Sequence, residues 1–467
     1  MAISCQFSQS RTLRSTGPRR FIAYDFPPLA RVKHLGPALR VRDFRLWWLA
    51  LLGMGIGLQM LEVAIGWEVY AQHRSALDLG WIGLAEFIPM FVLALPAGHL
   101  ADRLPRRLVF GAALGVGAAV GAGLAILSSS GDTSVVPYLA LAAGSGATTA
   151  LGNPAARSMA PTLVPASVLP SAMTLRSIAS QSAQVLGPAI GGLLYGSSPV
   201  LVYLLAGGMC LLASLAVLAM RAQPAADAAA AAAPGAGPAA APGAAPPGRT
   251  TAPGLESVLA GLRFVGRTQI LLGAILLDLL AVLFGGAVAL LPVFARSILH
   301  AGPAGLGILR AAPAVGALLA AALITRRPLA RRAGRTLLIV VCLYGASMVV
   351  FGLSRFYLLS LLALGVSGFV DLFSVSIRTT TVALATPDRL RGRVAAVEMV
   401  FISASNQLGA FESGLAAFLV GAVPAVVGGG VITVVIAVSW SRIFPDLARV
   451  DRLQDVRPAP AAPAVPR

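Results

Sequence analysis

Long apolar stretches recur along the whole of this sequence, and charged residues or Gly, Pro and Ser separate one from the next. Residues 46–70, 80–100 and 108–127 are examples, and each has the roughly 20 residues that a helix needs to cross about 30 Å of hydrocarbon. The pattern predicts about twelve membrane-spanning helices. Their expected centres are Met60, Met90, Gly117, Gly146, Leu186, Met209, Leu280, Ala317, Ser347, Leu364, Ser405 and Val434.

The predicted spans fall into two groups of six, one before residue 221 and one after residue 266. Between the groups, the tract AADAAAAAAPGAGPAAAPGAAPPG has nothing to bury and predicts a disordered linker. We therefore expect an all-α membrane protein with twelve transmembrane helices in two pseudo-symmetric six-helix bundles. The expected boundaries are 1–42 for a disordered cytoplasmic N-terminal arm, 43–221 for the first bundle, 222–266 for the cytoplasmic linker, 267–445 for the second bundle and 446–467 for a cytoplasmic tail.

Composition agrees with a membrane protein, because 57% of the residues are hydrophobic and only 12% are charged. The net charge of +18 could indicate a protein that binds nucleic acid, so the placement of the basic residues has to be considered. If both termini are cytoplasmic, the outside connections contain only Arg74, Arg296 and Arg355. That asymmetry follows the positive-inside rule, so we expect the lipid bilayer, and not nucleic acid, as the partner of the basic surface. Trp47 and Trp440 lie near span ends and are expected to be interfacial anchors.

The stretch GHLADRLPRR, residues 98–107, forms the predicted inside turn between the second and third spans. An acidic residue at the C-terminal end of a helix is opposed by the helix dipole, so we expect a partner for it on another element. A partner across a moving boundary would make this segment a conformational latch, whereas a purely topological role is the simpler alternative. The expected latch residues are Gly98, Asp102, Arg103, Arg106 and Arg107.

The segment QVLGPAIGG in the fifth predicted span combines small residues with a proline. Gly187, Gly191 and Gly192 remove side chains, and Pro188 removes one backbone donor, so the helix can bend and pack closely on a neighbour. A glycine-rich span that is merely well packed is the alternative interpretation.

Several of these motifs resemble those of a known family. The pattern G-x-L-A-D-R-x-x-R-R resembles the signature loop of the major facilitator superfamily, which usually has Gly where this sequence has Pro105. The Gly-Pro segment resembles the fifth-span motif of the superfamily's drug and proton antiporters. Residues 385–414, ATPDRLRGRVAAVEMVFISASNQLGAFESG, are similar to the subgroup of bacterial exporters related to the enterobactin exporter and to macrolide efflux proteins.

The resemblance implies a fold whose halves rock about a central cavity. It implies proton-coupled efflux of a small organic molecule, of the drug, macrolide or siderophore class, by a monomer in the bacterial inner membrane with both termini cytoplasmic. Uptake or exchange of a small metabolite by the same fold is the alternative. A membrane-embedded transferase is a distant one, because the sequence has no aspartate-rich motif and no metal-spaced His or Cys. We expect no enzyme activity, cofactor or metal.

Ionisable residues inside spans indicate where transport chemistry takes place, because each costs roughly 2.5 to 3.5 kcal/mol on insertion scales. Asp278 lies near the middle of LLGAILLDLLAVLFGG and is our first candidate for a proton carrier, with a hydrogen-bonded packing role as the alternative. Glu62 in the first span is the second candidate. Glu68 and Glu86 are expected near the outer surface and Glu398 near the inner one, where solvent explains them.

Two further sets of polar residues are candidates for translocation. Asp371 and Arg378 share one helix face at positions i and i+7 and are about two turns apart, so we expect each to meet a group on another helix or a water-filled cavity. A structural charge pair at the cytoplasmic mouth is the alternative. Glu412 and Asn406 belong to the 385–414 motif and are either translocation residues or braces of the eleventh span.

Overall fold

The computed structural model describes residues 36–221, 255–326, 332–387 and 390–451, with the side chains of 94–103, 255–259 and 396 left out. The first half consists of α1 (Gly36–Leu39), α2 (Arg42–His73), α3 (Ala76–Arg103), α4 (Arg106–Ser130), α5 (Val135–Met159), α6 (Leu169–Tyr195) and α7 (Pro199–Leu218). The second half consists of α9 (Leu255–Arg267), α10 (Gln269–Gly285), α11 (Leu291–Val293), α12 (Gly302–Arg326), α13 (Ala333–Leu353), α14 (Tyr357–Ala385), α15 (Arg391–Val420), α16 (Ala422–Ile443) and α17 (Pro445–Ala448).

Within the described ranges, 11 helical segments are long and apolar enough to cross a membrane. The exception among the long helices is α6, which has 27 residues but contains the polar sequence SIASQSAQ. Ser180 and Gln184 of that sequence line the cavity described below, so the lower hydropathy of α6 has a local cause. With α6 the chain has the expected all-helical membrane fold.

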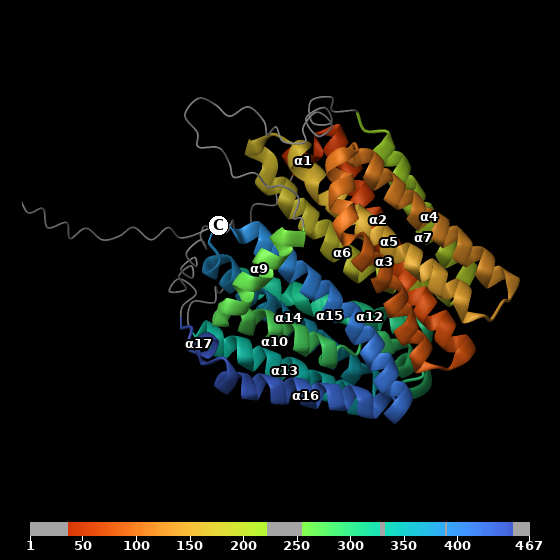
Figure 1. Ribbon diagram of the computed structural model, residues 1–467. Coiled ribbons are helices and arrows are strands. Elements are labelled where there is room, and N and C mark those ends of the chain that lie inside the picture. The colour runs from red at the N-terminus through yellow and green to blue at the C-terminus, as the bar shows by residue number, and fades with distance from the viewer. Residues whose placement is uncertain (1–35, 222–254, 327–331, 388–389, 452–467) are drawn as a thin grey trace, which may run out of the picture.

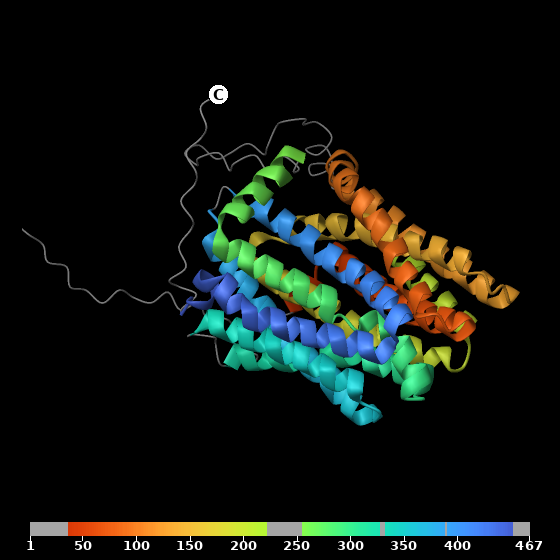
Figure 2. The ribbon, with the colours of Figure 1, turned by 60° about the horizontal axis from the view of Figure 1, so that its bottom comes forward.

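The helices form two groups that lie side by side, red to yellow-green for the first half and green to blue for the second (Figures 1 and 2). In the first half α4 packs on α7, α3 on α5 and α2 on α6, and in the second half α13 packs on α16 and α12 on α14. Two helix pairs make most of the contacts between the halves, α3 with α15 and α6 with α12, and α2 also contacts α11 and α12.

The prediction of a disordered linker over 222–266 is wrong for its last part, which is helical. Residues 222–254 lie outside the described ranges, whereas 255–267 form the helix α9, which packs on α15 and α10. The Ala/Pro/Gly composition ends before α9 begins, and GLRFVGR there supplies apolar residues such as Val265 that are buried.

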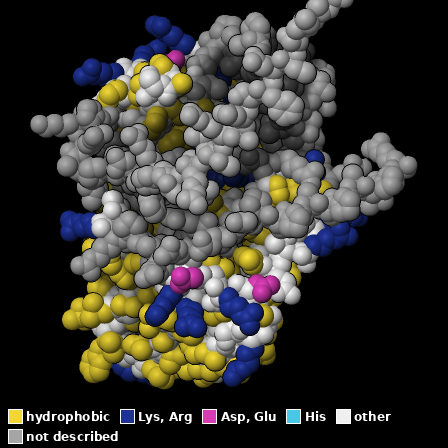
Figure 3. Space-filling model, turned by 90° about the vertical axis from the view of Figure 1, so that its left-hand side faces the viewer, with side chains coloured by type: hydrophobic (Ala, Val, Ile, Leu, Met, Phe, Trp, Pro, Cys, Tyr) yellow, Lys and Arg dark blue, Asp and Glu magenta, His cyan; other side chains and the backbone are white. Residues whose placement is uncertain are grey.

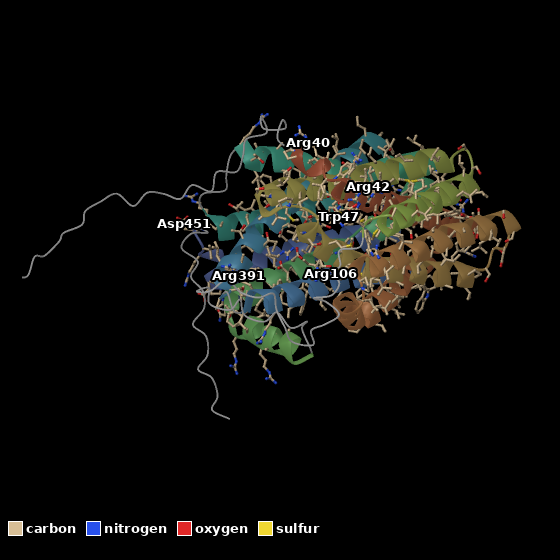
Figure 4. All side chains as sticks on the ribbon, turned by 90° about the horizontal axis from the view of Figure 1, so that it is seen from above. Arg40, Arg42, Trp47, Arg106, Arg391 and Asp451 are labelled. Atoms are coloured by element: carbon tan, nitrogen blue, oxygen red, sulfur yellow. The ribbon has the colours of Figure 1, made fainter. Side chains whose placement is uncertain are left out.

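Helix direction alternates along the chain, so the ends of the spans gather at two ends of the molecule. We call the end with the helix termini His73, Ser130, Tyr195, Leu353 and Val420 the closed end. The other, which holds the termini of the described chain, is the arginine-rich end. Figure 3 shows arginines on the described part of that face, and Figure 4 shows Arg106, Arg391 and Asp451 toward it.

The apolar core differs between the two ends. At the closed end one continuous core contains residues of both halves, Met60 and Phe294 among them. At the arginine-rich end each half has its own core, around Trp47 in the first and around Trp440 in the second. Packing therefore holds the halves together mainly at the closed end.

Trp47 and Trp440 are core residues and not interfacial anchors. Trp47 is fully buried and its indole donates a hydrogen bond to the Ala156 carbonyl at 3.2 Å. Trp440 donates to the Gly273 carbonyl at 2.9 Å. Each indole N–H thus finds a backbone acceptor inside its own bundle, which removes its need for the headgroup region.

Candidate functional site

A cavity of about 320 Å³ lies in the first half, at the boundary with the second. Its walls come from α2, α3, α5 and α6, and the second half contributes Gln407 of α15. Part of the lining is apolar, with Leu51, Met54, Leu58 and Met90. The amide and hydroxyl groups of the lining include those of Gln59, Thr149, Asn153, Ser180 and Gln184.

Glu62, the second proton-carrier candidate, lines this cavity from α2. Its carboxylate forms an ion pair with Arg310 of α12, so the pair connects the two halves across their boundary. The Glu62 side chain is 38% exposed and that of Arg310 is 13% exposed. The Nε of Arg310 is buried without a hydrogen-bond partner among the described residues.

Glu86 is a site residue that sequence reasoning placed wrongly at the outer surface. It lines the cavity from α3, and Gln407 of α15 donates a hydrogen bond to its carboxylate at 3.5 Å. The sequence contained one indication that Glu86 faces the interior: Gly83, Glu86 and Met90 follow i, i+3, i+7 spacing and so share one face of the helix. A Cβ at Gly83 would lie 2.8 Å from Ala410 on α15, so this face of α3 is the one in contact with the second half.

Glu68 was expected near the outer surface in contact with solvent, and this prediction was also wrong. Its side chain is 5% exposed and lies inside the first half. Tyr138 donates a hydrogen bond to one carboxylate oxygen at 2.9 Å and Tyr203 donates to the other at 2.5 Å. Tyrosines on α5 and α7 satisfy this acid in place of water.

A second group of charges lies inside the second half. Arg378 of α14 is 3% exposed, and its Nε lies 3.3 Å from the Asp278 carboxylate of α10. Its Nη1 donates to the Glu398 carboxylate of α15 at 2.6 Å. Arg378 thus meets groups on two other helices, and Glu398 belongs to this buried cluster and not to the solvated inner surface where it was expected.

Asp371 lies two helical turns from Arg378 on α14 and interacts electrostatically with both Asp278 and Arg378. The cluster therefore contains two carboxylates paired with the Arg378 guanidinium, from Asp278 and Glu398, with Asp371 two turns away on α14. Helix α10 packs on both α14 and α15, which brings these groups together.

Glu412 and Asn406 are not among the residues that line the cavity. Asn406 is exposed and donates a hydrogen bond to the Ile402 carbonyl of its own helix at 2.8 Å. The next residue, Gln407, has the cavity-lining position. The motif was therefore located correctly on α15, but one residue step is about 100° of helix rotation, which a single sequence does not assign to a face.

The expected latch is only partly within the described side chains: those of Gly98, Asp102 and Arg103 lie outside them. Arg106 donates to the Ser158 carbonyl at 3.2 Å, and Arg107 donates to the Met220 carbonyl at 3.1 Å. Both acceptors lie at the C-terminal ends of helices, α5 and α7, where a cation is favoured. These two arginines thus bind within the first half.

The glycines of the Gly-Pro segment lie at close helix contacts. A Cβ at Gly187 would lie 2.5 Å from Cβ of Gln59 on α2, and one at Gly191 would lie 3.0 Å from Cα of Met60. A Cβ at Gly192 would lie 2.8 Å from Cα of Gly307 on α12. Helix α6 continues through Pro188, whose carbonyl oxygen contacts the position of a Cβ at Gly307.

The same closeness recurs where α3 meets α15. A Cβ at Gly414 would lie 2.7 Å from Cα of Gly80. Nearby, the Tyr70 hydroxyl and the Ser297 hydroxyl are 2.8 Å apart and join α2 to the π-helix Phe294–Ile298 that follows α11. Backbone therefore approaches backbone between the halves at the closed end, in agreement with the continuous apolar core there.

The described residues form 11 apolar spans and the helix α6, in two halves that share a core at one end and have a cavity at their boundary. The class is that of the secondary transporters of the major facilitator superfamily. Within it, this chain belongs to the family described as transmembrane secretion effectors, whose profile matches residues 34–460. It is a multi-pass membrane protein and not an enzyme.

Curated relatives include enterobactin exporters. Enterobactin exporter EntS of Citrobacter koseri is 26% identical over 354 residues, which cover 75% of this chain and 79% of that protein. Enterobactin exporter EntS of Escherichia coli O81 gives the same identity and coverage.

Solved structures agree in fold at low identity. A mutant of nucleoside transporter NupG superimposes with a TM-score of 0.65 at 12% identity, covering 87% of this chain and 99% of that chain. A bacterial homolog of the human lysosomal transporter Spinster, in an inward-facing and occupied conformation, gives 0.63 at 14% identity, with 90% and 99% covered. A D-xylose-proton symporter gives 0.62 at 14% identity, with 87% and 98% covered.

Proposed function

We propose that this transporter exports small organic molecules in exchange for protons, by alternating access across the bacterial inner membrane. Both termini are cytoplasmic in this proposal, because the positive-inside rule puts the arginine-rich end there. The closed end then faces outward, and the cavity is loaded from the cytoplasm. The chain works as a monomer of two six-helix bundles, 43–221 and 267–445, with 98–107 as the latch between states.

The buried cluster around Arg378 carries the proposal. Arg378 is within ion-pair distance of both Asp278 and Glu398, so two carboxylates against one guanidinium leave one uncompensated negative charge inside the membrane-spanning region when both are ionised. Uncompensated charge is expensive there, so a bound proton relieves it. Asp278 is the proposed carrier, with Glu398 sharing the same guanidinium and Asp371 two helical turns away on α14.

Helix α15 supplies a physical route from the proton to the cavity. It carries Glu398, which pairs with Arg378, and Gln407, which bonds to Glu86 across the boundary. Nine residues separate the two, about 14 Å along the helix axis. Protonation of Glu398 or Asp278 changes the pairing of Arg378 and so biases how α15 packs on α3.

Export rather than uptake is supported by the family description and by the likeness to enterobactin exporters. Drug, macrolide and siderophore compounds are the first substrates to test. Uptake or exchange of a small metabolite is the second candidate, and the direction of proton flux separates the two.

The test uses full-length protein in liposomes that contain a pH dye, an imposed proton gradient and a compound panel. A substrate is expected to dissipate the gradient with wild type, and Asp278→Asn is expected to abolish that response while leaving the protein folded. Asn keeps the size of the side chain, and Glu398 still pairs with Arg378 in the variant. The control is Asp132→Asn, which removes an exposed carboxylate in a loop and leaves the flux unchanged.

Equal gradient-driven flux in Asp278→Asn and wild type would exclude Asp278 as the carrier. No flux with any compound, in protein shown to be folded, would contradict proton-coupled export and make metabolite uptake the next hypothesis.

A further inference from the structure

The cavity contains an acidic side chain that has no basic partner. Glu62 pairs with Arg310, whereas the carboxyl group of Glu86 has the uncharged amide of Gln407 as its hydrogen-bond partner. Both acids line the same cavity, and the described lining residues include no Lys or Arg. Glu86 is therefore an acid for which the described cavity residues offer no cation.

Ser145 gives a second and independent indication of a ligand. It lines the cavity from α5, its side chain is 8% exposed, and its Oγ has no hydrogen-bond partner among the described residues. A buried polar group left without a partner costs about 1–3 kcal/mol. A ligand that reaches this part of the cavity can supply the missing hydrogen bond.

Gly146 brings the two groups together. A Cβ at this position would overlap the carbonyl oxygen of Glu86, so the backbones of α3 and α5 touch at this point. Ser145, the neighbour of Gly146, therefore lies beside the helical turn that carries Glu86. One carboxyl group and one hydroxyl without a partner thus line the same cavity from neighbouring helical turns, a pair that suits a group with several N–H donors.

The rest of the lining limits the class of that ligand. Leu51, Met54, Leu58 and Met90 present apolar and polarizable surface to the same space. A volume of about 320 Å³ is within the range of small-molecule sites. An apolar body with one cationic end matches this lining better than a hydrated inorganic ion does.

We propose that the substrate is an amphipathic organic amine whose protonated nitrogen donates hydrogen bonds to the Glu86 carboxylate and to the Ser145 Oγ. The apolar part of the molecule lies against the leucine and methionine side chains. This assignment rests on the proposed function, because it names the substrate class for the same cavity. It differs from a siderophore or other anionic cargo, which Glu86 repels.

The test measures binding of matched fluorescent probes to full-length purified protein in detergent. Each probe carries a dansyl group on a pentyl chain that ends in an ammonium, a hydroxyl or a carboxylate group. We expect the ammonium probe to bind about tenfold more tightly than the hydroxyl probe, which is the effect of one charge-assisted hydrogen bond. The carboxylate probe is expected to bind most weakly.

Variants distinguish a change in the binding site from a loss of folding. Glu86→Gln is expected to weaken the ammonium probe about tenfold and to leave the hydroxyl probe within about twofold, so the second probe reports folding. Ser145→Ala is expected to weaken the ammonium probe by a smaller factor, about threefold. Asp132→Asn, a charge removal in an exposed loop, is expected to change neither.

Three results would overturn the amine assignment. They are equal affinity for all three probes, no binding of the ammonium probe to folded wild type, and displacement of that probe by Mg²⁺ at constant ionic strength. Proton flux with only neutral or anionic compounds would also overturn it and leave proton-coupled export standing. Binding through Glu86 without proton flux for any compound would support the amine site and contradict proton coupling.

Discussion

At the residue scale, the structure pairs three acids inside the spans of the first half in different ways. Glu62 has an arginine, Glu86 has an amide and Glu68 has tyrosine hydroxyls. These differences suit different roles. The hydrogen-bond donors of Glu68 are neutral and lie within the first half, so Glu68 is not positioned to respond to movement of the second half. We therefore assign Glu68 to the stability of the first half and reserve transport roles for Glu62 and Glu86.

Removing one tyrosine hydroxyl tests this assignment. Tyr203→Phe leaves one oxygen of the buried Glu68 carboxylate without its donor, so we expect a lower melting temperature and transport close to wild type in the protein that remains folded. The matched control is Tyr357→Phe, which removes a hydrogen bond of 3.1 Å to the neutral Gly305 carbonyl. Its loss of stability is expected to be smaller, because bonds to charged groups contribute about twice as much as neutral ones. An equal loss in both variants would argue against a charged Glu68.

At the element scale, four glycines allow α6 to reach α12 and α3 to reach α15 at the closed end. They are Gly192, Gly307, Gly80 and Gly414, and each faces backbone of the partner helix. Alternating access requires this contact to open and close. The strength of the contact therefore sets the fraction of protein molecules that are closed at this end. A smooth backbone contact allows close packing without interlocked side chains that would resist separation.

Enlarging one of these glycines is expected to favour the conformation that is open at the closed end. In Gly192→Leu the new side chain overlaps the α12 backbone near Gly307 and Pro303, and overpacking of this kind costs about 1–3 kcal/mol. We expect transport to fall and the reactivity of a cysteine introduced at Tyr70, which is 6% exposed, toward a membrane-impermeant thiol reagent to rise. Gly208→Leu is the control, because a Cβ there meets nothing within 4 Å. Unchanged reactivity in Gly192→Leu would mean that this contact does not limit opening.

At the scale of the whole molecule, the two ends differ in how the halves are joined. One apolar core crosses the boundary at the closed end, and separate cores lie at the arginine-rich end. A contact that does cross there is made by side chains: Arg157 of α5 donates to the sulfur of Met399 on α15 at 3.6 Å. The described conformation is thus closed at one end and held loosely at the other.

Cross-linking the closed end is expected to stop transport. In a background without native cysteines, Tyr70→Cys with Ser297→Cys places one thiol in each half, at the two residues whose hydroxyls are now 2.8 Å apart. Because Cys is much shorter than Tyr, the two thiols lie further apart than the hydroxyls do, and the reagent has to span that gap. A short bifunctional thiol reagent with a cleavable disulfide then fixes the joined halves, so flux is expected to fall to background and to return on reduction. The single-cysteine variants, treated in the same way, are the controls. Full flux in the cross-linked protein would show that this end does not open during transport.

The sequence by itself determined the class of fold, because the length and apolarity of a span are local properties. It also identified Asp278 and Arg378 as charges inside spans and the Gly-Pro segment as a run of small residues. Such features can be recognised in the sequence without knowing which helices pack together. It did not identify Glu86 or Glu398 as buried site residues, and it chose Asn406 where Gln407 lines the cavity. Which face of a helix meets a cavity depends on the rotation of that helix against its neighbours, and side chains far apart in the sequence fix that rotation.

The partners of the charged residues were likewise decided by tertiary structure alone. Arg378 is 100 positions from Asp278 and 20 from Glu398 along the chain, and Glu62 is 248 from Arg310. Burial makes a partner necessary, which a hydropathy pattern predicts, but only the packing of α10, α14 and α15, and of α2 on α12, selects the partner. Local physics therefore determined that these charges are paired, and the fold determined with which groups.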